Sequence, residues 1–175
     1  MEYITNIDFT VLNWIHSTLS CGFLDSVMPV ITKLGSKGAI WLAVAFVMMC
    51  TKKYRSCGII MVISLIAGVL IGNVFLKNII ARPRPCWINS EFNMLIGVPG
   101  DYSFPSGHTL SSAAAATVLT LENRKFGFGA IPVAALIAFS RLYLYVHFPT
   151  DIIAGALIGI TIGYAAFKLI KKQNI

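Results

Sequence analysis

Phe104-Pro105-Ser106-Gly107-His108-Thr109 is a short polar turn that runs directly into the apolar stretch of residues 110–119. This stretch has the composition of a membrane helix, so we expect His108 in the first turn of a helix, at the edge of the hydrocarbon. A first turn offers unpaired backbone N–H groups and the positive end of the helix dipole, which together bind anions. Ser106 is a suitable N-cap, and Gly107 allows the backbone to approach a ligand closely. The turn therefore predicts an anion site at the end of a membrane helix.

The composition of the whole chain is that of a membrane protein. Of its 175 residues, 57% are hydrophobic and 12% are charged, and the mean hydropathy is +0.77. A soluble domain averages about 45–50% apolar and about 25% charged residues. The net charge of +7 raises the question of a nucleic-acid partner. Because the basic residues lie at the ends of apolar runs and form no solvated stripe, we expect the lipid bilayer, and no nucleic acid, as the partner.

The apolar runs predict one all-α domain over residues 1–175, a polytopic membrane bundle of about six helices. Five of these helices are expected to span the membrane, for which about 20 mostly apolar residues are needed. The expected spans are residues 39–50, 57–76, 109–121, 126–139 and 152–167, and the run at 57–76 has the full length. The first is short, so we expect it to begin near Lys37 or to borrow residues from before the break at residues 35–38.

The N-terminal region gives a weaker signal. Residues 4–20 have an interrupted helical pattern that is typical of an interfacial helix, and residues 22–34 form a short apolar piece. The sequence leaves open whether residues 4–34 cross the membrane, lie on it or form a re-entrant pair. The N-terminus carries Glu2 and Asp8 and lacks a basic region and a small-residue cleavage pattern, so we expect no cleavable signal peptide.

The distribution of basic residues predicts the orientation. The loops at residues 51–56 and 122–125 and the C-terminal tail are short and basic, and alternating spans put them on one side, which the positive-inside rule makes cytoplasmic. The polar clusters at residues 77–85, 105–108 and 140–151 then share the extracytoplasmic face of the cytoplasmic membrane. Several cations there run against the rule, and we take the reason to be an anionic ligand: Lys77, Arg82, Arg84 and Arg141.

The first of these clusters, Lys77 to Pro85, is shaped by its prolines. Pro83 and Pro85 stop the preceding helix and favour extended backbone before them, so Arg82 and Arg84 are expected on a stiff, non-helical segment. The planar guanidinium can donate two hydrogen bonds at once to a phosphate. For Arg82 the simpler interpretation is an anchor that reaches the lipid headgroups.

The third cluster places His147 four residues before Asp151, across a break at Pro149. A carboxylate there can hold one imidazole N–H and leave the other ring nitrogen free to attack. A metal site is the rival interpretation of His108, His147 and Asp151, since transition metals take such ligands. Because three guanidinium groups and an ammonium would repel a cation, we expect an anion held without a metal or another cofactor. The tyrosines of this cluster are interpreted as part of an interfacial aromatic belt.

Two further patterns concern packing. Small residues recur at every fourth position in two spans, which is typical of close helix contacts within one subunit, with a dimer face as the alternative; they are Ser64, Gly68, Gly72, Gly155, Gly159 and Gly163. The oligomeric state is left open between monomer and homodimer. The four cysteines lack the spacing of a zinc site, and a Cys21–Cys86 disulfide stays conceivable.

The three clusters together resemble the three signatures of the type 2 phosphatidic acid phosphatases, the lipid phosphate phosphatase superfamily. The first is Lys77, six residues and Arg84-Pro85; the second is Pro105-Ser106-Gly107-His108; the third is Ser140-Arg141, five residues, His147, three residues and Asp151. Every defining position matches. The short members that the chain most resembles include undecaprenyl-diphosphatases and phosphatidylglycerophosphate phosphatases.

The resemblance implies a metal-independent hydrolase with assigned residue roles. His147 would be the nucleophile that forms a phosphohistidine, and Asp151 would orient it. His108 would protonate the leaving oxygen and then activate water. The remaining signature residues would hold the phosphate oxygens: Lys77, Arg84, Ser106, Gly107 and Arg141.

The expected function is therefore that of an integral-membrane lipid phosphatase. Undecaprenyl diphosphate is the favoured substrate, and phosphatidylglycerophosphate or phosphatidate comes next. A non-catalytic lipid-phosphate binder or transporter is the alternative of another class, but it would not need both histidines and Asp151. Vanadate-dependent haloperoxidases carry a similar anion site and resemble soluble proteins, which this chain does not.

Overall fold

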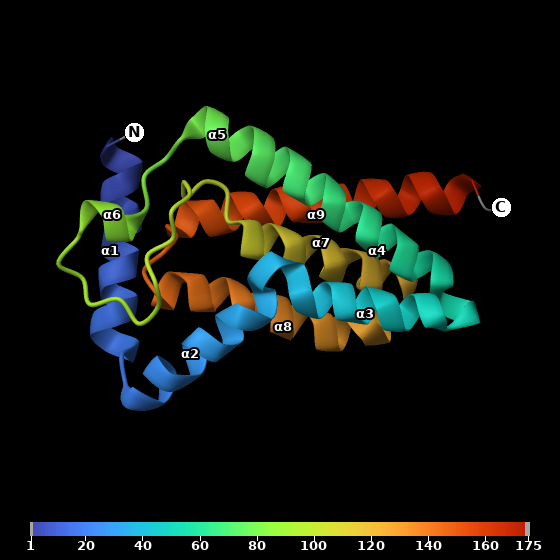
Figure 1. Cartoon of the computed structure of the whole chain (residues 1–175), viewed down its shortest axis with the longest axis horizontal. Coiled ribbons are helices and arrows are strands. Elements are labelled where there is room, and N and C mark those ends of the chain that lie inside the picture. The colour runs from blue at the N-terminus through green and yellow to red at the C-terminus, as the bar shows by residue number, and fades with distance from the viewer. Residues whose placement is uncertain (1, 174–175) are drawn as a thin grey trace.

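Helix α7 (Gly107–Glu122) lies in the middle of the molecule and packs against α8 (Arg124–Tyr143), α9 (Pro149–Gln173) and α4 (Arg55–Gly68). The structure, a computed structural model, describes residues 2–173, and within that range it contains helices and no strands (Figure 1). The other helices are α1 (Glu2–Leu19), α2 (Gly22–Gly35), α3 (Ala39–Cys50), α5 (Lys77–Ile80) and α6 (Pro85–Ile88), with short segments η1 (Ser36–Gly38), η2 (Lys52–Tyr54) and η3 (Val69–Leu76). The prediction of an all-α membrane bundle is confirmed.

The helical passes α2–α3, α4–α5, α7, α8 and α9 run in alternating directions along the bundle (Figure 1). Four stretches in the described part of the chain are long and apolar enough to cross a membrane: Gly22–Cys50, Lys52–Ile88, Arg124–Tyr143 and Pro149–Lys171. The fifth pass is α7, whose 16 residues are screened from lipid by its neighbours and are rich in buried alanine. A central helix needs small side chains more than strong hydropathy, because its neighbours approach it on all sides.

The first pass borrows α2, as the sequence suggested. Helices α2 and α3 form one stretch of 29 residues, which turns at η1 through left-handed backbone at Lys37 (φ 52°) and Gly38 (φ 70°). Helix α1 instead lies across the end of the bundle (Figure 1). It exposes an apolar stripe that includes Ile7 and Trp14 and buries Leu12 and Ile15, which is the two-faced arrangement expected of an interfacial helix.

The small-residue patterns are contacts within the chain. A Cβ on Gly163 would lie 2.6 Å from the backbone oxygen of Ala114, and a Cβ on Gly155 would lie 2.8 Å from that of Ser106. Helix α9 therefore packs backbone to backbone on α7. On the other side of α7, Gly68 of α4 packs against the side chain of Leu110. Both patterns are buried within the chain, so neither forms a dimer face.

One sequence expectation about the core is wrong, and one open question is answered. Tyr143 and Tyr145 do not belong to an interfacial belt: both are buried, and their hydroxyls donate to Asp25 Oδ1 at 2.6 Å and to Asn13 Oδ1 at 3.0 Å. Paired hydroxyls allow these rings to fill the core under α1. The four cysteines are all free thiols, so the Cys21–Cys86 disulfide is not formed.

We predict that Gly163→Ala destabilises the protein by about 1–3 kcal/mol, because the added methyl meets backbone that cannot rotate away. Thermal unfolding in detergent measures the change as a lower Tm. Gly129→Ala is the matched control, since a Cβ there has no atom within 4 Å and lies in α8. An unchanged Tm for the Gly163 variant, equal to that of the control, would contradict the packing of α7 on α9.

Candidate active site

A cavity of about 250 Å³ lies at the end of the bundle where α7 begins. It gathers residues from all three sequence clusters, and six of the eight residues predicted for the site line it: Lys77, Arg84, Gly107, His108, Arg141 and His147. Pockets for whole drug-sized ligands measure about 300–1,000 Å³. The cavity therefore has room for a headgroup rather than for a complete lipid.

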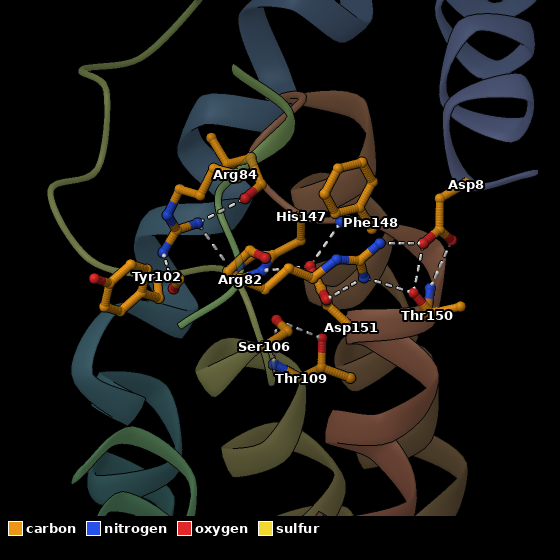
Figure 2. Close-up of polar contacts among 12 residues, drawn as sticks. Asp8, Arg82, Arg84, Tyr102, Ser106, Thr109, His147, Phe148, Thr150 and Asp151 are labelled. Atoms are coloured by element: carbon orange, nitrogen blue, oxygen red, sulfur yellow. Dashed lines mark hydrogen bonds and ion pairs between the residues drawn. The ribbon is translucent and has the colours of Figure 1, made fainter. Parts of the chain in front are cut away.

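His147 lies in the turn between α8 and α9, fully buried beside Arg84 and Asp151 (Figure 2). Its Nε2 is 3.2 Å from Arg84 Nη1, and its Nδ1 is 3.6 Å from Asp151 Oδ2. Because a guanidinium only donates, Nε2 must accept, which assigns the lone pair to Nε2 and the proton to Nδ1. The nitrogen that faces the cations is thus the one able to attack.

The surroundings of His147 keep its imidazole neutral. Burial lowers the pKa well below its ordinary value, and the charges of Arg84, Arg141, Lys77 and His108 lower it further. A neutral imidazole has the free electron pair that a nucleophile needs.

Asp151 lies behind His147 and does not line the cavity. Its Oδ2 accepts from the backbone N–H of Phe148 at 2.9 Å, and its Oδ1 accepts from Arg82 at 2.8 Å. The carboxylate is fully buried. Its position is therefore fixed from two sides, with one oxygen directed at the protonated nitrogen of His147 across a gap slightly longer than a hydrogen bond. Such gaps are common before substrate binds.

His108 lies in the first turn of α7, as predicted. Its ring hydrogen-bonds the backbone of Thr32, while Nε2 is buried and lacks a hydrogen-bond partner among the described residues. Buried polar atoms without a partner are uncommon in proteins. Since His108 lines the cavity, its Nε2 is available to a substrate atom there.

Ser106 is the N-cap of α7, as expected, because its hydroxyl accepts from the Thr109 backbone N–H and, at 3.0 Å, from the Thr109 hydroxyl. Its own N–H donates to the backbone oxygen of Asp151 at 3.2 Å. Ser106 thus ties α7 to α9 behind the cavity and is not part of the cavity wall. Gly107 does line the wall, where a Cβ would meet Asn73 Oδ1 at 2.6 Å.

The three cations of the cavity are held by different partners. Lys77 Nζ and Arg84 Nη2 each lie 2.6 Å from the carboxylate of Asp101, and Arg141 donates to the Thr32 hydroxyl at 2.6 Å. Burial alone would raise the pKa of Asp101, but the hydrogen bond from Lys77 and the charge of Arg84 outweigh it and hold this pKa at about 2. Asp101 is therefore an anion at neutral pH, and it occupies donors that a phosphate would use.

A π-helical segment brings Lys77 to the cavity. Leu65, Val69, Asn73 and Lys77 all line it at steps of four residues. In an α-helix each such step overshoots one turn by about 40°, so Lys77 would rotate well away from Leu65. The wider turn of η3 offsets that drift, and π segments are frequent at functional sites. The sequence showed only a continuous apolar span here.

A comparison with family models matches residues 57–175 to the PAP2 superfamily. The chain belongs to the PAP2 superfamily. A relative, the undecaprenyl-diphosphatase of Sulfolobus acidocaldarius, is 34% identical over 148 residues, which are 83% of this chain and 70% of that protein. The undecaprenyl-diphosphatase BcrC of Bacillus subtilis is 29% identical over 83% of this chain and 74% of its own length.

The fold has a solved counterpart within the PAP2 superfamily. The crystal structure of a transmembrane PAP2 type phosphatidylglycerolphosphate phosphatase from Bacillus subtilis superposes with a TM-score of 0.81 at 25% identity, over 98% of this chain and 88% of that one. The family, these relatives and the apolar helices make this protein a multi-pass membrane hydrolase that acts on lipid phosphates.

The PAP2 signatures do not contain every residue that shapes the site. Asp101 and Asn73 line the cavity, and Asp8 and Arg82 bind behind it. Of these four, the sequence singled out only Arg82. The interpretation of Arg82 as a lipid anchor is wrong, because its guanidinium pairs with Asp8 at 2.7 Å and with Asp151 at 2.8 Å. Each partner is distant in sequence from Arg82, so only the fold reveals the pairs.

We predict that the ring of His147 does not titrate between pH 6 and 8. Its pKa lies below the ordinary 6.5, so the neutral form persists as the pH falls through this window. The measurement is the pH dependence of its ¹⁵N chemical shifts in detergent, assigned by comparison with His147→Gln. A transition centred near 6.5 would contradict the described surroundings of the imidazole.

Proposed function

We propose that this PAP2 protein transfers a phosphoryl group from a lipid phosphate to Nε2 of His147 and then to water. The observation that carries the proposal is that two imidazoles and three cations, from helices and loops in separate parts of the chain, line one cavity. Phosphoryl transfer needs mainly positioning and stabilisation of charge on the phosphate oxygens. This cavity offers both.

In the first step Nε2 of His147 attacks phosphorus, and the bond between phosphorus and the leaving oxygen breaks. Lys77, Arg84 and Arg141 bind the phosphate oxygens, which displaces Asp101 from the first two. The negative charge of the bound phosphate favours protonation of His108 at Nε2, and His108 donates this proton to the leaving oxygen. Asp151 stabilises the N–H at Nδ1 as His147 gains positive charge.

In the second step a water molecule attacks the phosphohistidine. His108, now neutral, takes a proton from that water, and the bond between Nε2 and phosphorus breaks to release inorganic phosphate. His147 regains its neutral form with the proton on Nδ1. One group thus acts as acid and then as base, which suits an imidazole whose Nε2 is free in the resting site.

The favoured substrate is undecaprenyl diphosphate. Two relatives bear that activity in their names, and the cavity wall includes a fourth cation, Lys37, beyond the three signature cations. Leu65 and Val69 add an apolar wall from helices that face lipid. A diphosphate headgroup needs more positive charge than a monoester, and a lipid tail needs an apolar exit. Phosphatidylglycerophosphate is the second candidate, favoured by the structural likeness to the Bacillus enzyme.

The active site is proposed to face the outside of the cytoplasmic membrane, with the C-terminus inside. The basic loops at residues 51–56 and 122–125 and the end of α9 lie at the end of the bundle opposite the cavity (Figure 1). The positive-inside rule assigns that end to the cytoplasm.

We predict that His147→Ala abolishes turnover and that ³²P from labelled substrate is trapped on the wild-type protein but not on this variant. His108→Ala should lose about 10²–10⁴-fold in turnover, the usual size of a general acid–base contribution. His16→Ala is the matched control, because His16 packs on Phe92 outside the cavity. Normal turnover by His147→Ala would end the proposal.

We predict that phosphate release from a panel of detergent-solubilised lipid phosphates is fastest with undecaprenyl diphosphate and persists in excess EDTA. Lys37→Ala should lower kcat/KM for the diphosphate roughly tenfold, as expected for a hydrogen bond to a charged group, and leave monoester substrates almost unchanged. Lys33→Ala, an exposed lysine of α2 outside the cavity, is the control. Faster phosphate release from phosphatidylglycerophosphate would make that lipid the assigned substrate. Activity that is lost on chelation and restored by added metal would contradict a site that binds the phosphate without a metal.

We predict that a membrane-impermeant maleimide labels Glu91→Cys, but not Lys125→Cys, on intact cells that express the protein in a cysteine-free background. Both positions are exposed. The segment after α6, which holds Glu91, and the start of α8, which holds Lys125, lie at opposite ends of the bundle (Figure 1). The reverse pattern would place the site in the cytoplasm.

A further inference from the structure

The N-terminal helix α1 reaches the back of the active site through Asp8 (Figure 2). We propose that Asp8 and Arg82 are positioning residues that hold the carboxylate of Asp151 against His147, so that α1 is part of the catalytic apparatus. This inference rests on the proposed function and adds to it two residues that lie outside the PAP2 signatures.

The contacts form a continuous chain from α1 to the dyad of His147 and Asp151. Asp8 Oδ2 lies 2.7 Å from Arg82 Nη2, and Arg82 Nη1 donates to Asp151 Oδ1 at 2.8 Å. The two nitrogens of one planar guanidinium thus serve two carboxylates at once, which a lysine cannot reproduce. Cζ of this guanidinium lies 3.9 Å from the centroid of the Phe148 ring, and this stacking fixes the orientation of the guanidinium between its partners.

Asp8 also binds Thr150, the residue directly before Asp151. Thr150 donates its N–H to Asp8 Oδ1 at 3.1 Å and its hydroxyl to Asp8 Oδ2 at 2.6 Å. Arg82 donates to the same hydroxyl at 2.7 Å. Asp8 therefore fixes both the guanidinium that holds the carboxylate and the residue directly before Asp151, so a change at Asp8 can rotate the carboxylate relative to Nδ1 of His147.

Burial makes these contacts strong. Asp8 is 1% exposed and Asp151 is 0% exposed, while the side chain of Arg82 is 16% exposed. A buried charge that loses its partner is costly, so each member of this chain constrains the others. An exposed anchor for lipid headgroups would show the opposite, with free donors in solvent.

Helix α1 is itself held on two sides. Its inner face places Leu12 and Ile15 in the cluster that includes Val146 and Phe148, on either side of His147, and Phe9 packs edge-on against Phe148 at 5.2 Å. Its outer face carries the exposed apolar stripe that suits the membrane interface. Helix α1 thus connects the dyad of His147 and Asp151 to the membrane interface.

Substitution of a residue that only positions a catalytic group should lower kcat and leave substrate binding unchanged. Neither Asp8 nor Arg82 lines the cavity. A substitution at either residue therefore leaves the residues of the cavity wall, which bind the phosphate, in place. We expect Asp8→Asn and Arg82→Gln to lower kcat roughly tenfold to a hundredfold, the usual range for residues that orient a catalytic ligand. KM and the inhibition constant of orthovanadate should change less than twofold.

The experiment measures kcat, KM and vanadate inhibition for these variants, for the double variant and for Asp25→Asn. Asp25 is the matched control, since this N-terminal acid accepts from Tyr143 and does not contact the dyad. Because Asp8 acts through Arg82, the double variant should be little slower than Arg82→Gln. Additive losses, an equal weakening of vanadate binding, or a folded Asp8→Asn variant with normal kcat would each overturn the inference.

Two further measurements keep the inference separable from folding and from the proposed function. Thr150→Val removes one hydroxyl without changing charge or shape, so it should fold and show the same loss confined to kcat, to a smaller degree; an unchanged kcat would count against the inference. The ¹⁵N shift of His147 Nδ1 should change in Asp8→Asn and not in Asp25→Asn, whatever the substrate. Absence of lipid phosphatase activity in the wild type would overturn the proposed function, whereas an unmoved Nδ1 shift would overturn the positioning role.

Discussion

Mutual repulsion among three cations in one mostly buried cavity is the constraint on which the rest of this structure depends. Lys77 lies in α5, Arg84 lies in the segment before α6 and Arg141 lies in α8, and like charges close together at a protein site repel by several kcal/mol. Asp101 offsets two of them, and Arg141 hydrogen-bonds Thr32. Two of the cations share one carboxylate, so an anion with several oxygens would offset the three charges more fully. A phosphate would replace the shared carboxylate with three or four acceptors, which is why we propose that the site binds such groups.

The bundle supplies the stiffness that keeps these charges together. Helices α7 and α9 touch backbone to backbone through glycines, and the N–H of Ser106 bonds the carbonyl of Asp151 at the point where both helices begin. The first turn of α7, with His108, and the turn with His147 are therefore parts of one rigid unit. The π segment η3 then rotates Lys77 onto the same cavity. Polar groups at the ends of membrane helices normally face water, whereas here the packing turns them inward.

The sequence could predict this cavity because its main residues lie at short, fixed spacings that survive any packing. Spacing places His147 and Asp151 on either side of one helix start, and Ser106 caps the helix that carries His108. Spacing could not reveal Asp8 or Asp101, because each meets its partners only through tertiary contacts across many residues. It could not reveal Lys37 either, because only the fold places this residue in the cavity wall. The interpretation of Arg82 as a lipid anchor was wrong for the same reason. Its two buried carboxylate partners, Asp8 and Asp151, are distant from it in the sequence, so the sequence alone does not show the ion pairs. The tyrosines before His147 were misassigned because their partners, on α1 and α2, are more than a hundred residues away.

The central claim is that one tetrahedral anion is held between the cations with its phosphorus facing Nε2 of His147. The most direct measurement is an experimental structure with orthovanadate, which takes the trigonal-bipyramidal geometry of the transferred phosphoryl group. The account predicts vanadium bonded to Nε2 of His147, vanadate oxygens within hydrogen-bond distance of Lys77, Arg84 and Arg141, and Asp101 displaced from its two partners. Vanadate bound elsewhere, or bound with Asp101 still paired and His147 out of reach, would contradict it.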